Sequence, residues 1–463
     1  MMAFEGVLSG FWSTAIFLLV LSILIVVHEW GHFITAKLQG IQVDEFALGF
    51  GPTLWQRKWH GTNYMIKAFP LGGYVRMAGD EREKATGAPD EFFSKSPEQR
   101  ALVVFNGPLI NFVLAYVSFV LVFMLGYPDL STKVTEVVQD GPAVTSGIQV
   151  GDRVVALNGK KLWGLMHMER LLEGTDDSPM TVTIERGGQK MDYQIKPEVE
   201  ERPDLLQVPT MFREIGLGFL PNRVAIVDDT PADKAGLMPE DVIVGIDNMT
   251  VTNWRTLHEA VADTTGEFIK VSYIRDGKPA VMNIKPKIVE RTDSETGEMK
   301  KVRQLGVAPM QDTARYRFGF LESFGYGWDQ LWYITTLTYE ALYRMVTKTM
   351  PARDSLTGPV GIFVIVQESA KLGLSPLIFT LGVISASLAI FNLLPMLPLD
   401  GGHLALLAVE KARGRPLSQK VDEFFAKLGF TFIILLALYV FYIDFDRFGW
   451  IATVKDFFTN LGK

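Results

Sequence analysis

The sequence of 463 residues contains no cysteine and only six histidines. Without cysteine the chain has no disulfide, no thiolate nucleophile, no cysteine-ligated zinc and no iron–sulfur cluster. Any metal site must therefore combine histidine with carboxylate side chains. The net charge of -7 is modest and gives no indication that the chain binds nucleic acid.

Charged residues are missing from four long stretches, in a chain whose hydrophobic fraction is 48%. A helix of roughly 20 apolar residues crosses a bilayer core, and three of the stretches are that long. The fourth is shorter, but neighbouring aromatic residues extend it. We therefore expect a multi-pass α-helical membrane protein with four transmembrane helices, at 6–36, 101–128, 372–400 and 424–444.

Basic residues predict the orientation of these helices. None precedes the first helix, nine lie between the first and second, and five lie between the third and fourth. The positive-inside rule assigns both basic loops to the cytoplasm. Both termini and the long segment between the second and third helices then face outward.

The outward segment, residues 129–311, contains an internal repeat. Residues 141–148 match residues 230–237 with an offset of 89 positions, and the residues after each block continue the match. Further along, the similarity aligns 184–187 with 274–277. Each copy alternates short β-branched runs with turn residues, and one helical stretch is expected in each, at 163–173 and 254–262.

The repeated pattern of Pro-Ala, then Gly, then Asp followed by β-branched residues resembles the PDZ domain in its bacterial, circularly permuted form. We expect two α+β PDZ-like domains inserted between the second and third transmembrane helices, at 129–220 and 221–311. PDZ domains bind extended peptides and peptide C-termini at a sheet edge. The alternative is that the two domains act only as a steric plug or spacer, and the sequence leaves both open.

Two further segments have distinct compositions. Residues 37–100 contain glycine-punctuated aromatic and β-branched segments, which predict a β-rich, membrane-associated cytoplasmic loop. Residues 316–348 are rich in aromatic side chains with charges interspersed, and no run within them is long enough to cross a bilayer. An interfacial amphipathic helix on the outer leaflet is expected there.

The chemistry begins with the H-E-x-x-H pattern at His28, Glu29 and His32. On a helix, positions i and i+4 share a face, so both imidazoles can bind one zinc ion, with Glu29 beside them as a general base. From the motif alone, two unrelated surface histidines are the alternative. The pattern directly follows a charge-free run, however, and ionisable groups inside a membrane are costly and usually functional.

A catalytic zinc ion takes three protein ligands and keeps one position open. Asp400 is the candidate for the third ligand, because it ends the third charge-free stretch at the same predicted membrane level as His32. His403 is a rival, since two glycines separate it from Asp400. Asn392, a polar residue in the same stretch, either hydrogen-bonds substrate backbone or a developing oxyanion, or pairs within the helix bundle.

Together, the H-E-x-x-H motif, the segment around Asn106 and Asn111, the tandem PDZ-like units and the Leu-Asp-Gly sequence at Asp400 resemble the site-2 protease family. The resemblance is to its bacterial group with two periplasmic PDZ domains, in the inner membrane, and it covers nearly the whole chain. It implies an intramembrane zinc metalloprotease with one zinc ion. The implied ligands and general base are His28, His32, Asp400 and Glu29.

The resemblance also implies a substrate. In this family it is a hydrophobic transmembrane segment, typically of an anti-sigma factor already trimmed on its outer side during envelope stress signalling, and signal-peptide remnants are a second class. Gly73, Tyr74 and Val75 would form a strand edge that dips into the membrane and clamps the unwound substrate. The PDZ pair would filter substrates by size.

A second hypothesis has no catalysis. In it, the chain is a PDZ-bearing membrane receptor or chaperone whose metal is structural, and a closed site with four protein ligands would favour it. A metal transporter is a weaker reading, because no row of ligands crosses the predicted bilayer.

Overall fold

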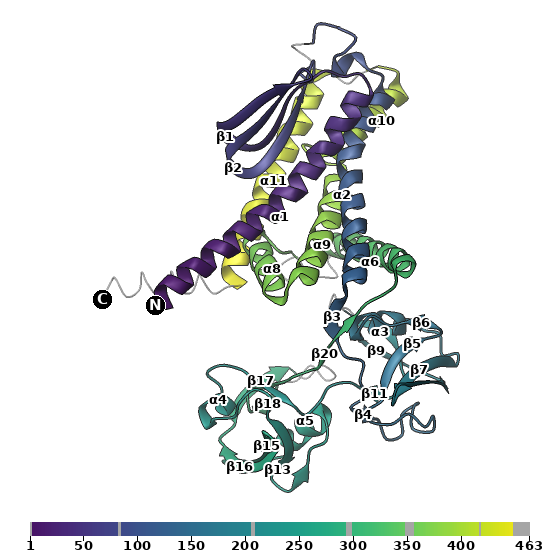
Figure 1. Cartoon of the computed structure of the whole chain (residues 1–463), viewed down its shortest axis with the longest axis vertical. Coiled ribbons are helices and arrows are strands. Elements are labelled where there is room, and N and C mark those ends of the chain that lie inside the picture. The colour runs from purple at the N-terminus through teal and green to yellow at the C-terminus, as the bar shows by residue number, and fades with distance from the viewer. Residues whose placement is uncertain are drawn as a thin grey trace. The chain divides into compact units, whose positions relative to one another are not determined.

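The computed structural model describes residues 2–81, 85–204, 209–292, 299–347, 356–415 and 418–447. The chain divides into two compact units (Figure 1). The membrane unit comprises Met1–Tyr127 and Arg317–Lys463, and the repeat unit comprises Pro128–Tyr316.

The membrane unit is mainly helical. Its helices are α1 (Met2–Leu38), η1 (Phe92–Ser94), α2 (Pro97–Leu125), α6 (Phe320–Val346), α8 (Pro359–Leu372), α9 (Leu374–Asn392), α10 (Asp400–Arg413) and α11 (Gln419–Arg447). Four of them, α1, α2, α9 and α11, contain segments long and apolar enough to cross a membrane. The expectation of four such helices is therefore confirmed at the level of length and composition.

Helix α2 contacts both α1 and α9. Its N-terminus is fixed by a capping box, in which Ser96 Oγ accepts a hydrogen bond from the Gln99 N–H and Gln99 Oε1 accepts one from the Ser96 N–H. Large side chains such as Phe119 and Phe123 are fully buried along its length. Helix α2 is therefore the packing centre of the membrane unit.

The third membrane segment differs from the predicted span at 372–400. Helix α9 ends at Asn392, and α10 begins at Asp400. The residues between them include Pro395 and Pro398, which lack the N–H that a continuous helix needs. Helix α8 was not predicted from the sequence. Its N-terminus is capped by Asp444 of α11, whose carboxylate accepts hydrogen bonds from the N–H groups of Gly358, Val360 and Gly361.

The segment before α2 folds into a sheet of two long, bent strands, β1 (Val43–Trp59) and β2 (Thr62–Met77), that contact α1. Residues 45–48 pair with 63–66 on one side and with 73–76 on the other. Residues 53–59 pair with 62–67. Within the described part of the chain, the sheet thus has residues 69–77 at one edge and 53–59 at the other.

The aromatic segment forms helix α6, which packs against α2 and α9. Leu321, Trp332 and Tyr343 on this helix remain exposed. Its location at a membrane surface stays a prediction.

The repeat unit holds two equivalent four-stranded sheets, each with its own hydrophobic core. The first is ordered β6-β5-β7-β8 and the second β14-β13-β15-β16. The strands of the first half are β3 (Tyr127–Leu130), β4 (Glu136–Val137), β5 (Arg153–Leu157), β6 (Lys160–Lys161), β7 (Met180–Arg186), β8 (Gln189–Ile195), β9 (Glu198–Pro203), β10 (Pro209–Glu214) and β11 (Leu217–Gly218), with helix α3 (Leu165–Leu172). Those of the second half are β12 (Val224–Ile226), β13 (Val242–Ile246), β14 (Met249–Thr250), β15 (Ile269–Arg275), β16 (Lys278–Ile284), β17 (Lys287–Thr292), β18 (Met299–Gln304), β19 (Val307–Pro309) and β20 (Thr313–Tyr316), with helices α4 (Pro231–Ala235) and α5 (Trp254–Ala262).

An ion pair between a buried aspartate and a partly exposed arginine recurs in the two halves and corrects the repeat alignment. Asp152 bonds to Arg186 in the first half, and Asp241 bonds to Arg275 in the second. Both pairs are related by the offset of 89, so the match of 184–187 with 274–277 was shifted by one residue. The error came from aligning the glycines Gly187 and Gly277, which occupy different positions in their hairpin turns.

The first of these ion pairs gives a pH-dependent prediction. Hydrogen bonds from Arg186 hold the pKa of Asp152 below its usual value, against the opposing effect of burial. A depressed pKa stabilises the fold above the unfolded value of about 3.9 and loses that stabilisation as the pH falls through the folded pKa. We expect Asp152→Asn to lower the free energy of opening at the β5 and β7 amides by about 2–3 kcal/mol at pH 7, and by much less at pH 3. Hydrogen exchange of the full chain, corrected for intrinsic rates, measures both.

The control for this prediction is Asp177→Asn, which breaks the exposed pair between Asp177 and Lys196 in the same half. It should change protection by less than about 0.5 kcal/mol. Equal losses in the two variants, or a loss in Asp152→Asn that is the same at both pH values, would contradict the assignment.

Candidate metal centre

The H-E-x-x-H motif lies well inside helix α1, which continues to Leu38. His28 and His32 therefore project from one face, with their Nε2 atoms 3.2 Å apart. Their side chains are largely buried, at 13% and 12% exposed. Two imidazoles this close favour a shared cation, since their lone pairs otherwise face each other.

Asp400, the first residue of α10, completes the group. Its Oδ2 atom is 3.2 Å from His28 Nε2, and its Oδ1 atom is 3.6 Å from His32 Nε2. Among the described residues, His28, His32 and Asp400 form the cluster of donors close enough to hold one metal ion. The structure thus brings together the three ligands expected from the sequence.

The spacing of these donor atoms suits zinc. Bonds of about 2.0–2.1 Å in a tetrahedral arrangement separate neighbouring ligand atoms by roughly 3.3–3.4 Å. The nearest contacts are close to that value: 3.2 Å between the two Nε2 atoms, and 3.2 and 3.6 Å from these atoms to the two carboxylate oxygens of Asp400. Two neutral imidazoles and one carboxylate also match the ligand types of catalytic zinc, and three ligands leave one tetrahedral position open.

The other ring nitrogen of each histidine has a partner on α2. His32 Nδ1 lies 2.9 Å from the Val103 carbonyl oxygen, which accepts its proton and leaves Nε2 for the metal. His28 Nδ1 lies 3.4 Å from Asn111 Nδ2. Asn111 is fully buried, and its Oδ1 atom has no hydrogen-bond partner among the described residues. Exchanging the amide's oxygen and nitrogen lets Oδ1 accept the proton of His28 Nδ1, which satisfies both groups and frees Nε2.

Two glycines allow α1 and α2 to approach this closely. A Cβ atom on Gly107 would overlap the His32 ring and contact His28 at 3.0 Å. A Cβ atom on Gly31 would overlap the Asn106 carbonyl. Small residues at such a crossing let helix backbones come together within a membrane. Asn106 reinforces the crossing through hydrogen bonds from its amide to the Gly31 carbonyl and to Thr35.

The edge of the sheet lies beside Glu29. A Cβ atom on Gly73 would be 3.2 Å from Glu29 Cγ, and the Val75 backbone hydrogen-bonds to the Glu29 carboxylate. The Tyr74 hydroxyl donates to Glu45 at 2.8 Å. Gly73, Tyr74 and Val75 all belong to the edge segment 69–77, so the predicted strand-edge residues are adjacent to the predicted general base.

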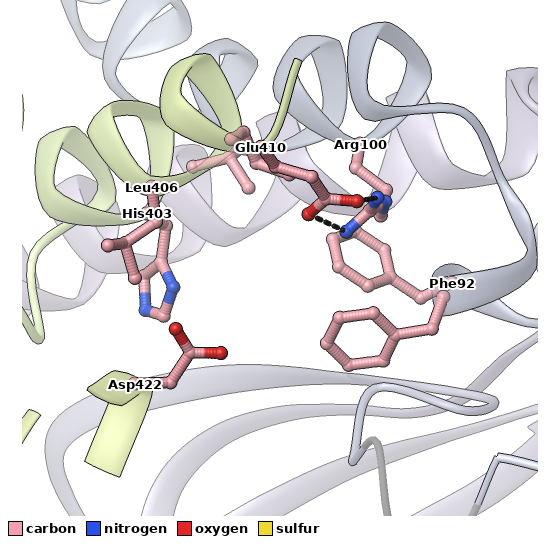
Figure 2. Close-up of a pocket in the computed structure, with 9 residues that line it drawn as sticks. Phe92, Arg100, His403, Leu406, Glu410 and Asp422 are labelled. Carbon is pink, nitrogen blue, oxygen red and sulfur yellow. Dashed lines mark hydrogen bonds and ion pairs between the residues drawn. The ribbon is translucent and has the colours of Figure 1, made fainter. Parts of the chain in front are cut away.

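Asn392 and His403 flank the metal ligand on α10. Asn392 is the half-buried last residue of α9, eight positions before Asp400. His403 lines a separate cavity of about 90 Å³ and turns its ring toward Asp422 of α11 (Figure 2). The geometry therefore favours Asp400 over His403 as the third ligand.

The segment around Asn106 and Asn111 entered the sequence-based prediction only as part of the family resemblance, and its residues were given no role at the metal centre. Asn106, Gly107 and Asn111 had a usable signal, because two amides and a glycine in a charge-free run are unusual for a lipid-facing helix. The role of the Val103 carbonyl had no signal in the sequence, because any residue at that position would offer the same backbone oxygen.

Comparison with known proteins agrees with a metal centre of the protease type. The family described as Peptidase family M50 matches residues 16–436. Regulator of sigma-E protease RseP of Escherichia coli is 31% identical, with 95% of this chain and 100% of that protein covered. Protease RseP of Yersinia pestis is 32% identical with the same coverage. A Neisseria meningitidis protein whose name describes a zinc metalloprotease is 29% identical, with 93% of this chain and 98% of its own length covered.

The helix crossing yields a test of the metal centre. We expect Gly107→Ala to lower zinc affinity at least about tenfold, because the added methyl group displaces the His32 ring. Zinc content after dialysis against a graded chelator measures the loss. Gly325→Ala in α6 is the matched control, since a Cβ atom there meets nothing within 4 Å. Full zinc retention by Gly107→Ala would show that the ligands do not depend on this crossing.

Proposed function

The chain belongs to peptidase family M50, the site-2 protease family, and is a zinc metalloprotease; from that premise we propose that it cuts peptide bonds inside the membrane-spanning segments of other proteins. The observation that carries the proposal is the ligand geometry. His28, His32 and Asp400 offer donors at zinc spacing, on or directly after helices that are apolar enough to cross a bilayer. A soluble protease has no need to build its metal centre in such a segment.

The proposed roles follow from position. Zinc, when bound, supplies a Lewis acid that polarises a peptide carbonyl and makes water more acidic. Glu29 takes the proton from the attacking water and delivers it to the leaving amine. The hydrogen bond from Val75 orients the Glu29 carboxylate. Asn392 donates its amide N–H to the substrate backbone or to the oxyanion.

Substrate unwinding explains why a strand edge adjoins the general base. A transmembrane helix holds its carbonyl groups in internal hydrogen bonds, so the scissile bond is inaccessible until the helix opens. Residues 73–75 offer replacement backbone hydrogen bonds to an extended substrate, as in strand addition. The proximity of Gly73 to Glu29 supports this role.

The substrate class is inferred from the relatives. Those from Escherichia coli and Haemophilus influenzae are named regulators of sigma-E protease. We infer that this chain, a bacterial inner membrane protein, regulates sigma-E by cleaving the transmembrane segment of a pre-trimmed anti-sigma factor. Remnants of signal peptides share the same apolar helical character and are a second substrate class.

The proposed topology follows the basic loops. Both termini and the repeat unit face the periplasm, and the metal centre lies near the cytoplasmic side, where water reaches it.

The two halves of the repeat unit are PDZ-like domains. Support for peptide binding comes from a groove of about 290 Å³ in the second half, lined by α5 and by residues 303–307. We infer that this groove takes a free peptide C-terminus and that the paired domains also restrict bulky substrates.

The direct test of catalysis is Glu29→Gln. This variant should lose at least about a hundredfold in cleavage of a membrane-embedded reporter, because general-base catalysis is removed. Its zinc content should equal that of the wild type, since the ligands are unchanged. Glu368→Gln, which removes an exposed carboxylate on α8, is the control. Undiminished, zinc-dependent cleavage by Glu29→Gln would refute the assigned role, and absence of cleavage by the wild type would favour a structural metal.

Substrate unwinding makes a separate prediction. Two glycines placed beside the scissile bond should raise kcat/KM about tenfold, because each lowers helix stability by about 0.8–1 kcal/mol. Methionine, a comparable helix former, placed at the same two positions should have little effect. Reporters reconstituted in one lipid composition allow the comparison. Equal rates for the glycine and methionine substrates would mean that opening the helix does not limit cleavage.

A further inference from the structure

A buried ion pair joins α2 to α10. Arg100 Nη2 lies 2.6 Å from Glu410 Oε1, and Arg100 Nη1 lies 3.3 Å from Glu410 Oε2 (Figure 2). The side chains are 5% and 13% exposed. The pairing is bidentate, so it fixes both the distance and the rotation of one helix against the other.

The guanidinium is held on its remaining sides as well. Arg100 Nε donates to the Lys95 carbonyl at 3.2 Å, and the group lies 5.4 Å from the centre of the Phe93 ring. Arg100 is therefore oriented by the segment before α2 and by the start of α2 itself. Glu410 docks onto a cation whose direction is already set.

This contact is linked to both halves of the ligand set. Val103, which accepts the hydrogen bond from His32, lies one helical turn after Arg100 on α2. Asp400 and Glu410 begin and nearly end α10, about 15 Å apart along its axis. One short stretch of α2 thus contacts the helix of the third ligand and orients one of the first two.

Close packing is incomplete beside the C-terminal part of α10. The cavity of about 90 Å³ adjoins the ion pair, with Phe92, Leu406 and His403 among its lining residues (Figure 2). The chain before Asp400 is also non-helical from residue 393 onward. This loop fixes the start of α10, because a Cβ atom on Gly401 or Gly402 would overlap the backbone of residues 393–397. At the other end of the helix, beside the cavity, Glu410 is held by its contact with Arg100.

We propose that Arg100 and Glu410 are positioning residues that aim α10 so that the Asp400 carboxylate reaches the two histidines. The inference rests on the proposed role of Asp400 as a zinc ligand. The pair does not touch the metal or the substrate. It acts by setting the orientation of the helix that begins with the ligand.

A second ion pair provides a matched control. Lys411 and Glu98 join the same two helices at 3.1 Å, next to Glu410 in sequence. Their side chains are 64% and 55% exposed, so water screens them. General attraction between α2 and α10 would involve both pairs, whereas helix positioning requires only the buried, bidentate one.

The experiment measures Zn²⁺ affinity of the full-length protein in detergent by chelator competition, and the visible spectrum of the Co²⁺-loaded protein as a signature of ligand geometry. The variants are Glu410→Gln, Arg100→Lys and the exchange Arg100→Glu with Glu410→Arg, with Glu98→Gln and Lys411→Gln as controls. We expect Glu410→Gln and Arg100→Lys to weaken Zn²⁺ binding about 10- to 100-fold and to alter the Co²⁺ spectrum. The exchange should recover most of the affinity, and the controls should stay within about twofold of the wild type.

The inference would be overturned if Glu410→Gln and Arg100→Lys kept wild-type Zn²⁺ affinity and an unchanged Co²⁺ spectrum. It would also be overturned if the controls lost as much Zn²⁺ affinity as these variants. If Glu410→Gln does not fold, Arg100→Lys decides, because it keeps the buried charge while losing the bidentate geometry. Asp400→Asn separates the two proposals. Undiminished zinc binding by Asp400→Asn defeats the proposed ligand set, whereas loss of zinc in that variant alone defeats only the positioning role.

Discussion

Two imidazoles and a carboxylate whose nearest donor atoms lie 3.2 to 3.6 Å apart, within largely apolar helices, are the constraint on which the membrane unit depends. Two imidazoles and a carboxylate are costly to bury beside lipid unless a cation compensates them. Their spacing matches the edge of a zinc tetrahedron. The glycines at the helix crossing, the break between α9 and α10 and the hydrogen bonds to the histidines all serve to keep these atoms in place.

Helix α2 carries most of this support without contributing a ligand. Its Val103 carbonyl and Asn111 amide contact the outer nitrogens of His32 and His28, and its Gly107 lets α1 come close. Because outer partners fix the orientation of metal-binding histidines, they influence affinity nearly as much as the ligands. The ligands come from two distant parts of the chain, and α2 is the element that both parts contact.

The cluster of His28, His32 and Asp400 could be predicted from the sequence, because H-E-x-x-H has a fixed helical geometry and Asp400 ends a charge-free stretch at the same predicted membrane level. The supporting contacts could not. Val103 acts through its backbone, and Arg100 and Glu410 are 310 positions apart with nothing in the sequence to pair them. The end of α9 at Asn392 depends on how the chain turns at Pro395 and Pro398, which the length of an apolar run does not reveal. In the repeat unit, a shared glycine shifted the alignment by one residue, whereas the recurring Asp–Arg ion pair gives the true register.

The most direct test of the central claim is the position of the cut. The purified protein and a single-span substrate, reconstituted together in lipid vesicles with zinc, would give products whose new termini mass spectrometry can locate. The account predicts a cut inside the apolar segment, toward its cytoplasmic end, that disappears when zinc is chelated and returns when it is restored. A cut confined to the soluble flanks of the substrate, or one that is indifferent to zinc, would contradict it.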